Sequence, residues 1–209
     1  MNKNEAVESG DVLPISESFY SIQGEGYHTG GSAFFLRIGG CDISCSWCDT
    51  KYSWETNYHK LISIKELAQK VLTYPAKSVV ITGGEPTLFN LEKFTLLLKN
   101  KGIKTFLETT GSYPIKGNFD WVCLSPKQNK PPLASSYKLA NELKIIIYDI
   151  ESDFKWAEKQ EKLVAPKCKL YLQPEWSRFK ENKNVIIQYI KDNPKWNLSV
   201  QLHKFLKIS

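Results

Sequence analysis

The residues with the clearest chemical character are three cysteines within one short segment. Cys41, Cys45 and Cys48 lie in CDISCSWCDT, with three residues between the first two and two residues between the last two. In a reducing compartment, a tight group of thiols is typical of a metal site rather than of disulfides. A structural zinc site takes four protein ligands, and His59, the nearest candidate for a fourth, lies outside the segment. Three thiolates on a four-iron cluster would leave one iron open, so the pattern favours a catalytic metal centre.

The composition is typical of a globular protein with one core. The chain has 209 residues, of which 42% are hydrophobic and 12% aromatic, and we expect a single domain spanning residues 1–209. It has no run of about 20 apolar residues that could cross a bilayer, and its polar start lacks the apolar segment of a secretory signal. These features predict a cytoplasmic protein that does not associate with membranes. Cys123 and Cys168, in apolar segments away from the cluster, are expected to be small buried residues.

Short β-branched runs alternate with amphipathic segments along the chain. The amphipathic segments predict helices at 62–74, 90–102, 151–164 and 182–194. The β-branched runs predict strands at 33–38, 78–83, 103–108, 119–124, 142–148, 169–174 and 198–203. This alternation predicts an α/β fold with a mostly parallel sheet, as an open sheet or a barrel.

Distinctive polar segments accompany the ends of these predicted strands. In chain order they are GGCDISC, TGGEPT, ETTGS, SPK and QPEWSR. Parallel sheets place their chemistry at the carboxyl ends of the strands, so the polar segments are expected to meet at one edge of the sheet.

The cysteine segment resembles the signature of the radical S-adenosylmethionine enzymes. That signature has the same three-cysteine spacing with an aromatic residue before the last cysteine, here Trp47, and GGEP at 83–86 matches a second segment of the superfamily. The resemblance implies a four-iron, four-sulfur cluster on Cys41, Cys45 and Cys48, whose free iron binds S-adenosylmethionine. Reductive cleavage of the bound cofactor then yields methionine and a 5'-deoxyadenosyl radical.

A longer resemblance covers nearly the whole chain in order. The segment at 17–54, together with ITGGEP, ETTGS, LSPK, LQPEW and VQLHKFLKIS, is similar to the 7-carboxy-7-deazaguanine synthase family. This resemblance implies an incomplete TIM-like barrel and the Mg2+-dependent ring contraction of 6-carboxy-5,6,7,8-tetrahydropterin to 7-carboxy-7-deazaguanine, with loss of ammonia, in queuosine and 7-deazapurine biosynthesis. It implies regenerated S-adenosylmethionine, a homodimer, and an electron donor such as flavodoxin or ferredoxin.

The same resemblance carries site roles onto the matching residues of this chain. Thr50 is the expected Mg2+ ligand, because a hard cation prefers oxygen ligands and keeps its own waters. The expected cofactor-binding residues are Trp47, Cys48, Asp49, Gly84, Glu85, Ser125, Pro126, Lys127, Gln173, Pro174, Glu175 and Trp176. The expected substrate-binding residues are Ile22, Gln23, Gly24, Arg37, Thr82, Gln201, His203 and Ser209, the last through its terminal carboxylate. No side chain is expected to act as a conventional acid or base.

Some of these residues also have a chemical rationale of their own. Arg37 offers a planar fork that suits the substrate carboxylate, although an isolated arginine at a strand end is more often a surface residue. Gln201 and His203 are two residues apart on the predicted strand 198–203 and would face one side of it. The glycines after Gln23 would let backbone groups line a flat ring.

Two other functions remain open from the sequence. One is an activase of the same superfamily that installs a glycyl radical on a partner protein. The other is a zinc-binding module that contacts RNA, suggested by the three thiols and the net charge of +6. No stripe alternates basic and aromatic residues, so we expect no nucleic-acid partner.

Overall fold

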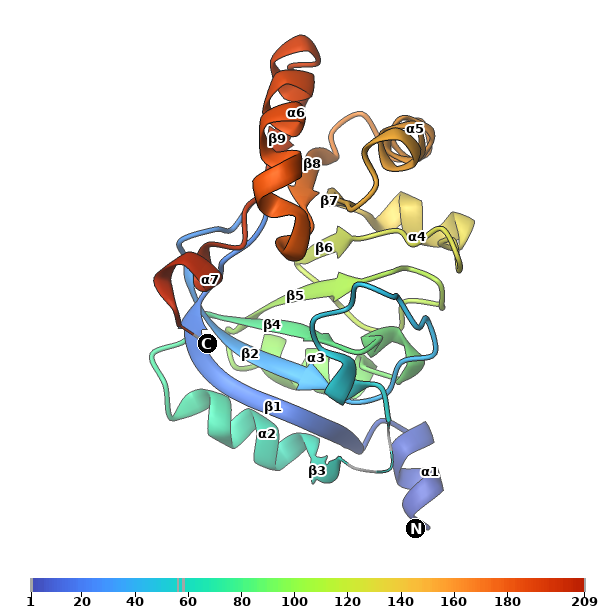
Figure 1. Ribbon diagram of the computed structural model, residues 1–209. Coiled ribbons are helices and arrows are strands. Elements are labelled where there is room, and N and C mark those ends of the chain that lie inside the picture. Colours follow the sequence, from blue (N-terminus) through green and yellow to red (C-terminus); the bar gives the residue numbers. More distant parts are fainter. Residues whose placement is uncertain (1, 56, 58, 209) are drawn as a thin grey trace.

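The computed structural model describes residues 2–55, 57 and 59–208, and within them the strands form one continuous sheet (Figure 1). The sheet has nine strands in the order β3-β1-β2-β4-β5-β6-β7-β8-β9. Their bounds are β1 Val12–Ile22, β2 Ser32–Ile38, β3 Lys60–Ser63, β4 Ser78–Gly83, β5 Lys104–Thr109, β6 Trp121–Leu124, β7 Glu142–Ile147, β8 Lys169–Pro174 and β9 Trp196–Leu198. From β2 to β9 each strand is parallel to its neighbour, whereas β1 is antiparallel to both β2 and β3.

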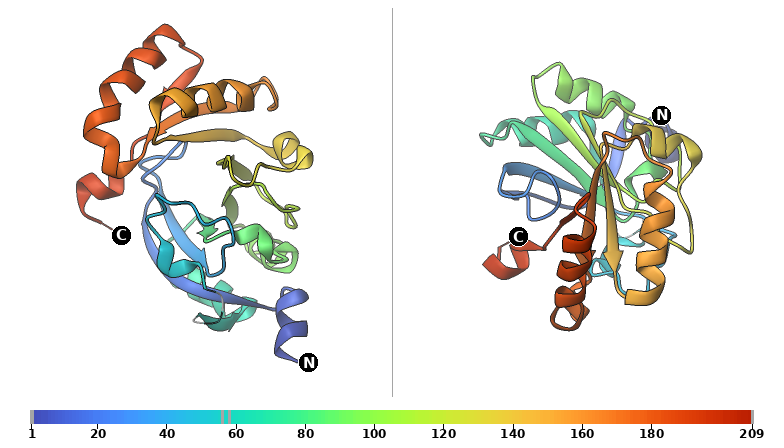
Figure 2. Two further views of the ribbon diagram at one scale, coloured as in Figure 1. Left: turned by 45° about the vertical axis from the view of Figure 1, so that its right-hand side comes forward. Right: turned by 90° about the horizontal axis from the view of Figure 1, so that it is seen from above.

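Helices follow most of the strands and cover the outer side of the curved sheet (Figure 2). The helices are α1 Lys3–Glu8, α2 Ile64–Leu72, α3 Glu92–Lys99, α4 Ala134–Leu139, α5 Ile150–Glu161, α6 Phe179–Asp192 and α7 Leu202–Leu206. Short 3-10 turns lie at η1 Lys51–Ser53, η3 Pro86–Leu88 and η4 Trp176–Arg178. The sheet is mostly parallel and its two end strands do not pair, so the prediction of an open α/β barrel is confirmed.

Helix α2 illustrates how local sequence specifies these elements. Ser63 caps the helix by accepting a hydrogen bond from the backbone N–H of Glu66 at 3.2 Å. The buried side chains that follow have helical spacing, so one face of α2 packs on the sheet; they are Ile64, Leu67, Ala68 and Val71.

Strand β7 shows how the sheet separates its core from its inner face. Leu143, Ile145 and Ile147 are buried in the core beneath α5 and α6. Lys144 and Ile146 alternate with them and line a cavity on the concave side of the sheet. The inner face of this strand therefore carries a charged group deep in the protein.

The chain segments that follow β1 and β9 close the gap between the two ends of the sheet. The backbone N–H of Leu202 donates to the carbonyl of Gly24 at 2.9 Å. The N–H of Gly26 donates to Oγ of Ser199 at 3.0 Å. We call residues 199–206 the C-terminal strap, because they tie the open edge of the barrel to the loop after β1.

The last predicted strand was wrong in its bounds. Strand β9 ends at Leu198, and the chain then turns into α7, with Gln201 immediately before the helix. The last ladder bond runs from the backbone N–H of Ser199 to Leu172, and the Ser199 hydroxyl donates to Gln173. Beyond Ser199 the chain turns toward the cavity. Gln201 and His203 therefore do not share one face of a strand.

The buried cysteines match their prediction. The exposed fraction of Cys123 is 1% and that of Cys168 is 7%, and both are free thiols. Burial raises the pKa of Cys168 to about 12, so this thiol stays protonated and unreactive at neutral pH.

Candidate active site

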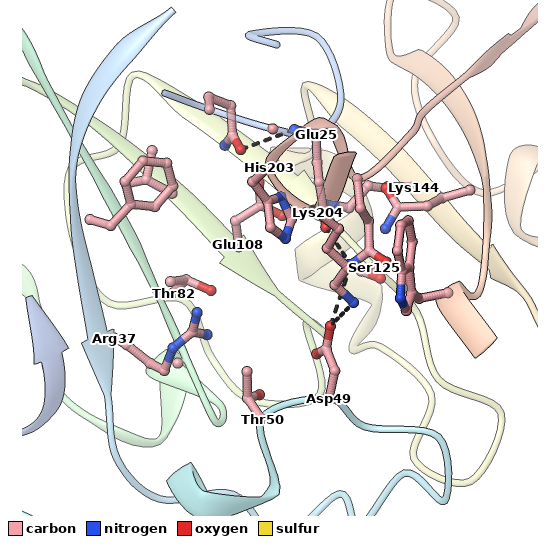
Figure 3. A pocket seen from close by; sticks show the side chains of 18 of the residues that line it. Glu25, Arg37, Asp49, Thr50, Thr82, Glu108, Ser125, Lys144, His203 and Lys204 are labelled. Atoms are coloured by element: carbon pink, nitrogen blue, oxygen red, sulfur yellow. Dashed lines mark hydrogen bonds and ion pairs between the residues drawn. The ribbon is translucent and has the colours of Figure 1, made fainter. Parts of the chain in front are cut away.

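A cavity of about 670 Å³ opens at the carboxyl ends of the parallel strands (Figure 3). Its wall includes a residue at or just after the end of each of several strands: Arg37 of β2, Thr82 of β4, Thr109 of β5, Ser125 after β6, Ile146 of β7 and Gln173 of β8. The volume suits a small molecule with its cofactor. The expected meeting of polar strand ends is confirmed.

The cysteine loop lies at the edge of this cavity and is held by backbone hydrogen bonds. The N–H of Gly40 donates to Ser53 O at 2.7 Å, and the N–H of Glu85 donates to Gly40 O at 2.8 Å. A Cβ added to Gly84 would lie 2.3 Å from Gly40 O, so only glycine allows the GGEP segment to approach this loop so closely.

The thiols of the loop suit a polynuclear cluster better than a single metal ion. Cys41, Cys45 and Cys48 are all free and half-buried. Among the described residues, no three His, Cys, Asp or Glu side chains converge on a site for one ion. In an iron-sulfur cluster each thiolate binds a different iron, so its ligands are spread around the cluster. A structural zinc site takes four protein ligands, whereas this loop supplies three cysteines.

Some of the residues expected to bind substrate and Mg2+ lie on one side of the cavity, where Figure 3 shows Arg37, Thr82 and Thr50 together. Arg37 and Thr82 are register partners on adjacent strands. Nε of Arg37 donates to a carboxylate oxygen of Glu17 at 2.8 Å, which fixes the guanidinium. The hydroxyl of Thr50 lies 3.5 Å from the sulfur of Cys48, so the expected magnesium ligand directly adjoins the expected cluster.

The SPK and QPEW segments form another part of the wall. Nζ of Lys127 donates to the carbonyl and the hydroxyl of Ser125, both at 2.7 Å, and lies 5.4 Å from the centroid of the Trp47 ring. Burial lowers the pKa of Lys127. Oε1 of Gln173 accepts from Ser199 at 2.6 Å. Trp176 lines the cavity with its side chain partly exposed.

The C-terminal strap brings Gln201 and His203 to the cavity from the opposite side. Nε2 of Gln201 donates to Oε1 of Glu25 at 2.9 Å. A Cβ on Gly24 would lie 2.3 Å from Nδ1 of His203, so the loop after β1 and the strap pack closely only because residue 24 is glycine. Burial lowers the pKa of His203, which favours its neutral form.

Most of the residues expected from the sequence line this one cavity. They are Ile22, Gln23, Gly24, Arg37, Trp47, Asp49, Thr50, Thr82, Gly84, Ser125, Lys127, Gln173, Glu175, Trp176, Gln201 and His203. Cys45 and Pro126 line a neighbouring cavity of about 300 Å³ that shares Trp47 and Lys127 with the first. Pro174 is buried, and Ser209 lies outside the described residues.

Glu85 has a structural position that differs from the other expected cofactor residues. Its side chain is fully buried, and its carboxylate accepts hydrogen bonds from Thr87, Thr109 and Thr110. These bonds join the loop after β4 to the end of β5. Glu85 therefore braces the GGEP segment from behind rather than lining the cavity.

Five charged residues that line the cavity were not predicted from the sequence: Glu17, Glu25, Glu108, Lys144 and Lys204. Three of them meet. Nζ of Lys144 lies 2.7 Å from Oε2 of Glu25 and 2.9 Å from Oε2 of Glu108. Burial alone would raise the pKa of Glu25, but the charge and hydrogen bond of Lys144 bring it down to about 2. Burial alone would lower the pKa of Lys144, but the surrounding acidic groups raise it well above its usual value. The sequence feature that could have indicated this charge cluster is Lys144, which lies inside the apolar run ELKIIIY.

Comparisons with known proteins agree with this site. The model of the radical SAM superfamily matches residues 36–126, which include the cysteine loop, GGEP and the start of SPK. The chain is 47% identical over 203 residues to the 7-carboxy-7-deazaguanine synthase of Flavobacterium psychrophilum, covering 97% of this chain and 96% of that protein. It is 48% identical over 195 residues to the synthase of Synechocystis sp., covering 93% of each.

The fold agrees as well. The crystal structure of QueE from Escherichia coli matches with a TM-score of 0.83 and 29% sequence identity, covering 97% of this chain and 99% of that chain. No helix in the described part of the chain is long and apolar enough to span a membrane. With relatives this similar along nearly their whole length, the chain belongs to the 7-carboxy-7-deazaguanine synthase family of radical SAM enzymes.

Proposed function

We propose that the cavity carries out the reaction of its family, the ring contraction of 6-carboxy-5,6,7,8-tetrahydropterin to 7-carboxy-7-deazaguanine with loss of ammonia. The observation that carries this proposal is that one cavity of about 670 Å³ is lined both by a basic side chain, Arg37, and by two residues of the cysteine segment, Trp47 and Thr50. A small substrate with one carboxylate and a polar ring suits these surroundings.

The cofactor side of the cavity is the cysteine loop with its neighbours. Cys41, Cys45 and Cys48 would hold a four-iron, four-sulfur cluster, and when bound the cluster and S-adenosylmethionine supply the abstraction of a hydrogen atom from the substrate. The protein's own part is to seat and orient that cofactor. We assign this role to the residues of the loop, GGEP, SPK and QPEW segments: Trp47, Cys48, Asp49, Gly84, Ser125, Pro126, Lys127 and the residues from Gln173 to Trp176, with Glu85 bracing GGEP.

The substrate side of the cavity is centred on Arg37. Its bond to Glu17 uses Nε, so the terminal nitrogens are available to a carboxylate. Thr50 offers the hydroxyl for Mg2+, which would neutralise charge on the substrate carboxylate. The remaining contacts come from Ile22, Gln23, Gly24, Thr82, Gln201, His203 and Ser209. In this proposal the side chains bind and orient, and none serves as a conventional acid or base.

The proposal extends to assembly and location. We expect all 209 residues to act as one domain, a homodimer in the cytoplasm, reduced by a small donor such as flavodoxin or ferredoxin. The continuous sheet supports one domain. Five free cysteines suit a reducing compartment. Phe205 and Leu206 are about half exposed and offer apolar surface for a second copy to cover.

Complementation tests this function in a cell. The chain is expressed in a bacterial strain that lacks its own 7-carboxy-7-deazaguanine synthase, and queuosine in transfer RNA is measured by mass spectrometry. We expect the wild type to restore queuosine and Cys45→Ala to fail. Cys168→Ala, which alters a buried thiol away from the cavity, is the matched control and should restore it. Absence of queuosine in cells that contain the intact wild-type protein would contradict the proposal.

A further inference from the structure

The inner face of the sheet carries a lysine between two carboxylates. Lys144 of β7 has a side chain only 5% exposed, whereas the side chains of Glu25 and Glu108 are 19% and 21% exposed and line the cavity. Its ammonium lies within 3 Å of one oxygen from each carboxylate. A buried ammonium requires such partners, since an unpaired buried charge is strongly unfavourable.

We infer that Lys144 is a positioning residue of the active site: it holds Glu25 and Glu108 together as two ionised acceptors for the N–H groups at the aminopyrimidinone edge of the substrate. This inference rests on the proposed function, because it is a pterin that presents such an edge. An ionised carboxylate can only accept hydrogen bonds, whereas a protonated one also carries an O–H donor. The group that keeps them ionised thus determines what the cavity can recognise.

The three residues come from separate parts of the chain, so it is the tertiary structure that brings them together. Glu25 lies in the loop after β1, Glu108 is on β5 and Lys144 is on β7. Without the ammonium, two carboxylates that now bind the same nitrogen would face each other as like charges. One of them would then take up a proton and become a donor, which would oppose a substrate N–H.

Other contacts fix the orientation of this acceptor pair. The second oxygen of Glu25 accepts from Gln201 of the C-terminal strap, so this carboxylate cannot rotate freely. In Figure 3, Arg37 and Lys144 lie on opposite sides of the cavity. A substrate with a carboxylate at one end and N–H donors at the other would therefore bind in one direction, with its carboxylate toward Arg37.

Binding of stable ligands tests this inference without turnover. The probes are 6-carboxypterin and 6-carboxylumazine, in which a carbonyl oxygen replaces the 2-amino group and would face the carboxylates. Calorimetry on the cluster-loaded protein should show that the wild type binds the pterin about tenfold or more tighter than the lumazine. Lys144→Met should lose this preference and Lys144→Arg should keep part of it. Lys93→Met, which removes a surface pair with Asp11, should keep it fully.

Infrared spectroscopy provides a readout that a purely structural role would not change. A protonated carboxyl band stronger than any in the wild type at neutral pH should appear in Lys144→Met. If that variant does not fold, Glu25→Gln serves instead and should lose part of the preference for the pterin. The inference is overturned if the folded variants bind the two probes with wild-type preference. Failure of the proposed function would appear separately, as a wild type that binds neither probe and forms no deazapurine.

Discussion

The ammonium of Lys204 lies 2.6 Å from the carboxylate of Asp49, so the C-terminal strap is tied directly to the cysteine loop. Both residues line the cavity, and Lys204 also lies 5.3 Å from the centroid of the Trp176 ring. The strap completes the wall of an open barrel and joins its substrate side to its cofactor side.

Loss of this ion pair should loosen the strap more than it destabilises the protein. Lys204→Met removes a partly exposed pair worth about 0.2–1 kcal/mol, so global unfolding should change little. Amide hydrogen exchange within residues 199–206 should rise by roughly twofold to fivefold, as local opening becomes easier. Lys155→Met, which breaks an exposed pair with Glu151 on α5, is the control. Unchanged exchange in the strap would contradict its attachment to the loop through Lys204.

Gly84 should be required for assembly of the cluster site. In Gly84→Ala the new Cβ would meet backbone, Gly40 O at 2.3 Å, and neither segment can move without breaking the hydrogen bonds that fix the loop. Iron and sulfide content after reconstitution should fall well below that of the wild type. Gly102→Ala gives the comparison, because its φ of +73° adds strain with no atom within 4 Å. That variant should lose about 1 kcal/mol of stability yet retain its iron.

Arg37 should affect substrate use and not cofactor cleavage. Arg37→Ala removes a charge-assisted hydrogen-bonding group, so kcat/KM for the pterin should fall by about tenfold to a hundredfold. Deoxyadenosine formation without substrate should persist. Glu17→Gln, which leaves the arginine but weakens its orienting bond, should have a smaller effect. Normal turnover by Arg37→Ala would show that the arginine does not bind the substrate.

Ionisation of Glu142 should lower the stability of the folded protein as pH rises. Burial raises the pKa of Glu142, whose Oε2 accepts from Trp121 Nε1 at 3.0 Å. Because the folded-state pKa exceeds the unfolded value of about 4.3, stability falls as pH rises from that value to the folded pKa. Glu142→Gln does not titrate and escapes this loss.

Urea unfolding at pH 5 and pH 8 checks this expectation. Relative to the wild type, Glu142→Gln should have a larger free energy of unfolding at pH 8 than at pH 5, because only the wild type loses stability as Glu142 ionises. Glu25 does not interfere, because its folded-state pKa of about 2 places its contribution in a lower window. Its stabilisation is lost only as pH falls below about 4.3. An equal difference at the two pH values would mean that Glu142 ionises normally.

Much of the architecture could be predicted from sequence, because β2 and β4 to β8 are apolar runs, and clear helical patterns lie before β4, before β5 and on both sides of β8. Strand β1 was missed because polar side chains interrupt VLPISESFYSI and Pro14 lies within it. Residues 198–203 were predicted as a strand because LSVQLH alternates. No local pattern reveals that Leu202 donates instead to Gly24 in the loop after β1.

Site residues could be predicted where they belong to motifs that follow the strands. They could not be predicted where charged side chains from distant parts of the chain are brought together by the tertiary structure. Arg37, Thr50 and Gly84 belong to segments with a recognisable signature. Lys144 lies between apolar residues of β7, whereas Glu108 begins the ETTGS segment. Their partnership depends on the curvature that brings β5, β7 and the loop after β1 together. The spacing of these residues in the sequence does not show how close they are in the folded protein.

One anaerobic reaction tests the central claim most directly. The iron-reconstituted protein is mixed with S-adenosylmethionine, a reductant, Mg2+ and 6-carboxy-5,6,7,8-tetrahydropterin, and the products are identified by mass spectrometry. The account predicts 7-carboxy-7-deazaguanine and ammonia, with no product from Cys45→Ala. A cluster-loaded wild type that releases deoxyadenosine but no deazapurine would contradict the assigned substrate, and a protein that binds zinc and assembles no cluster would contradict the role of the three cysteines.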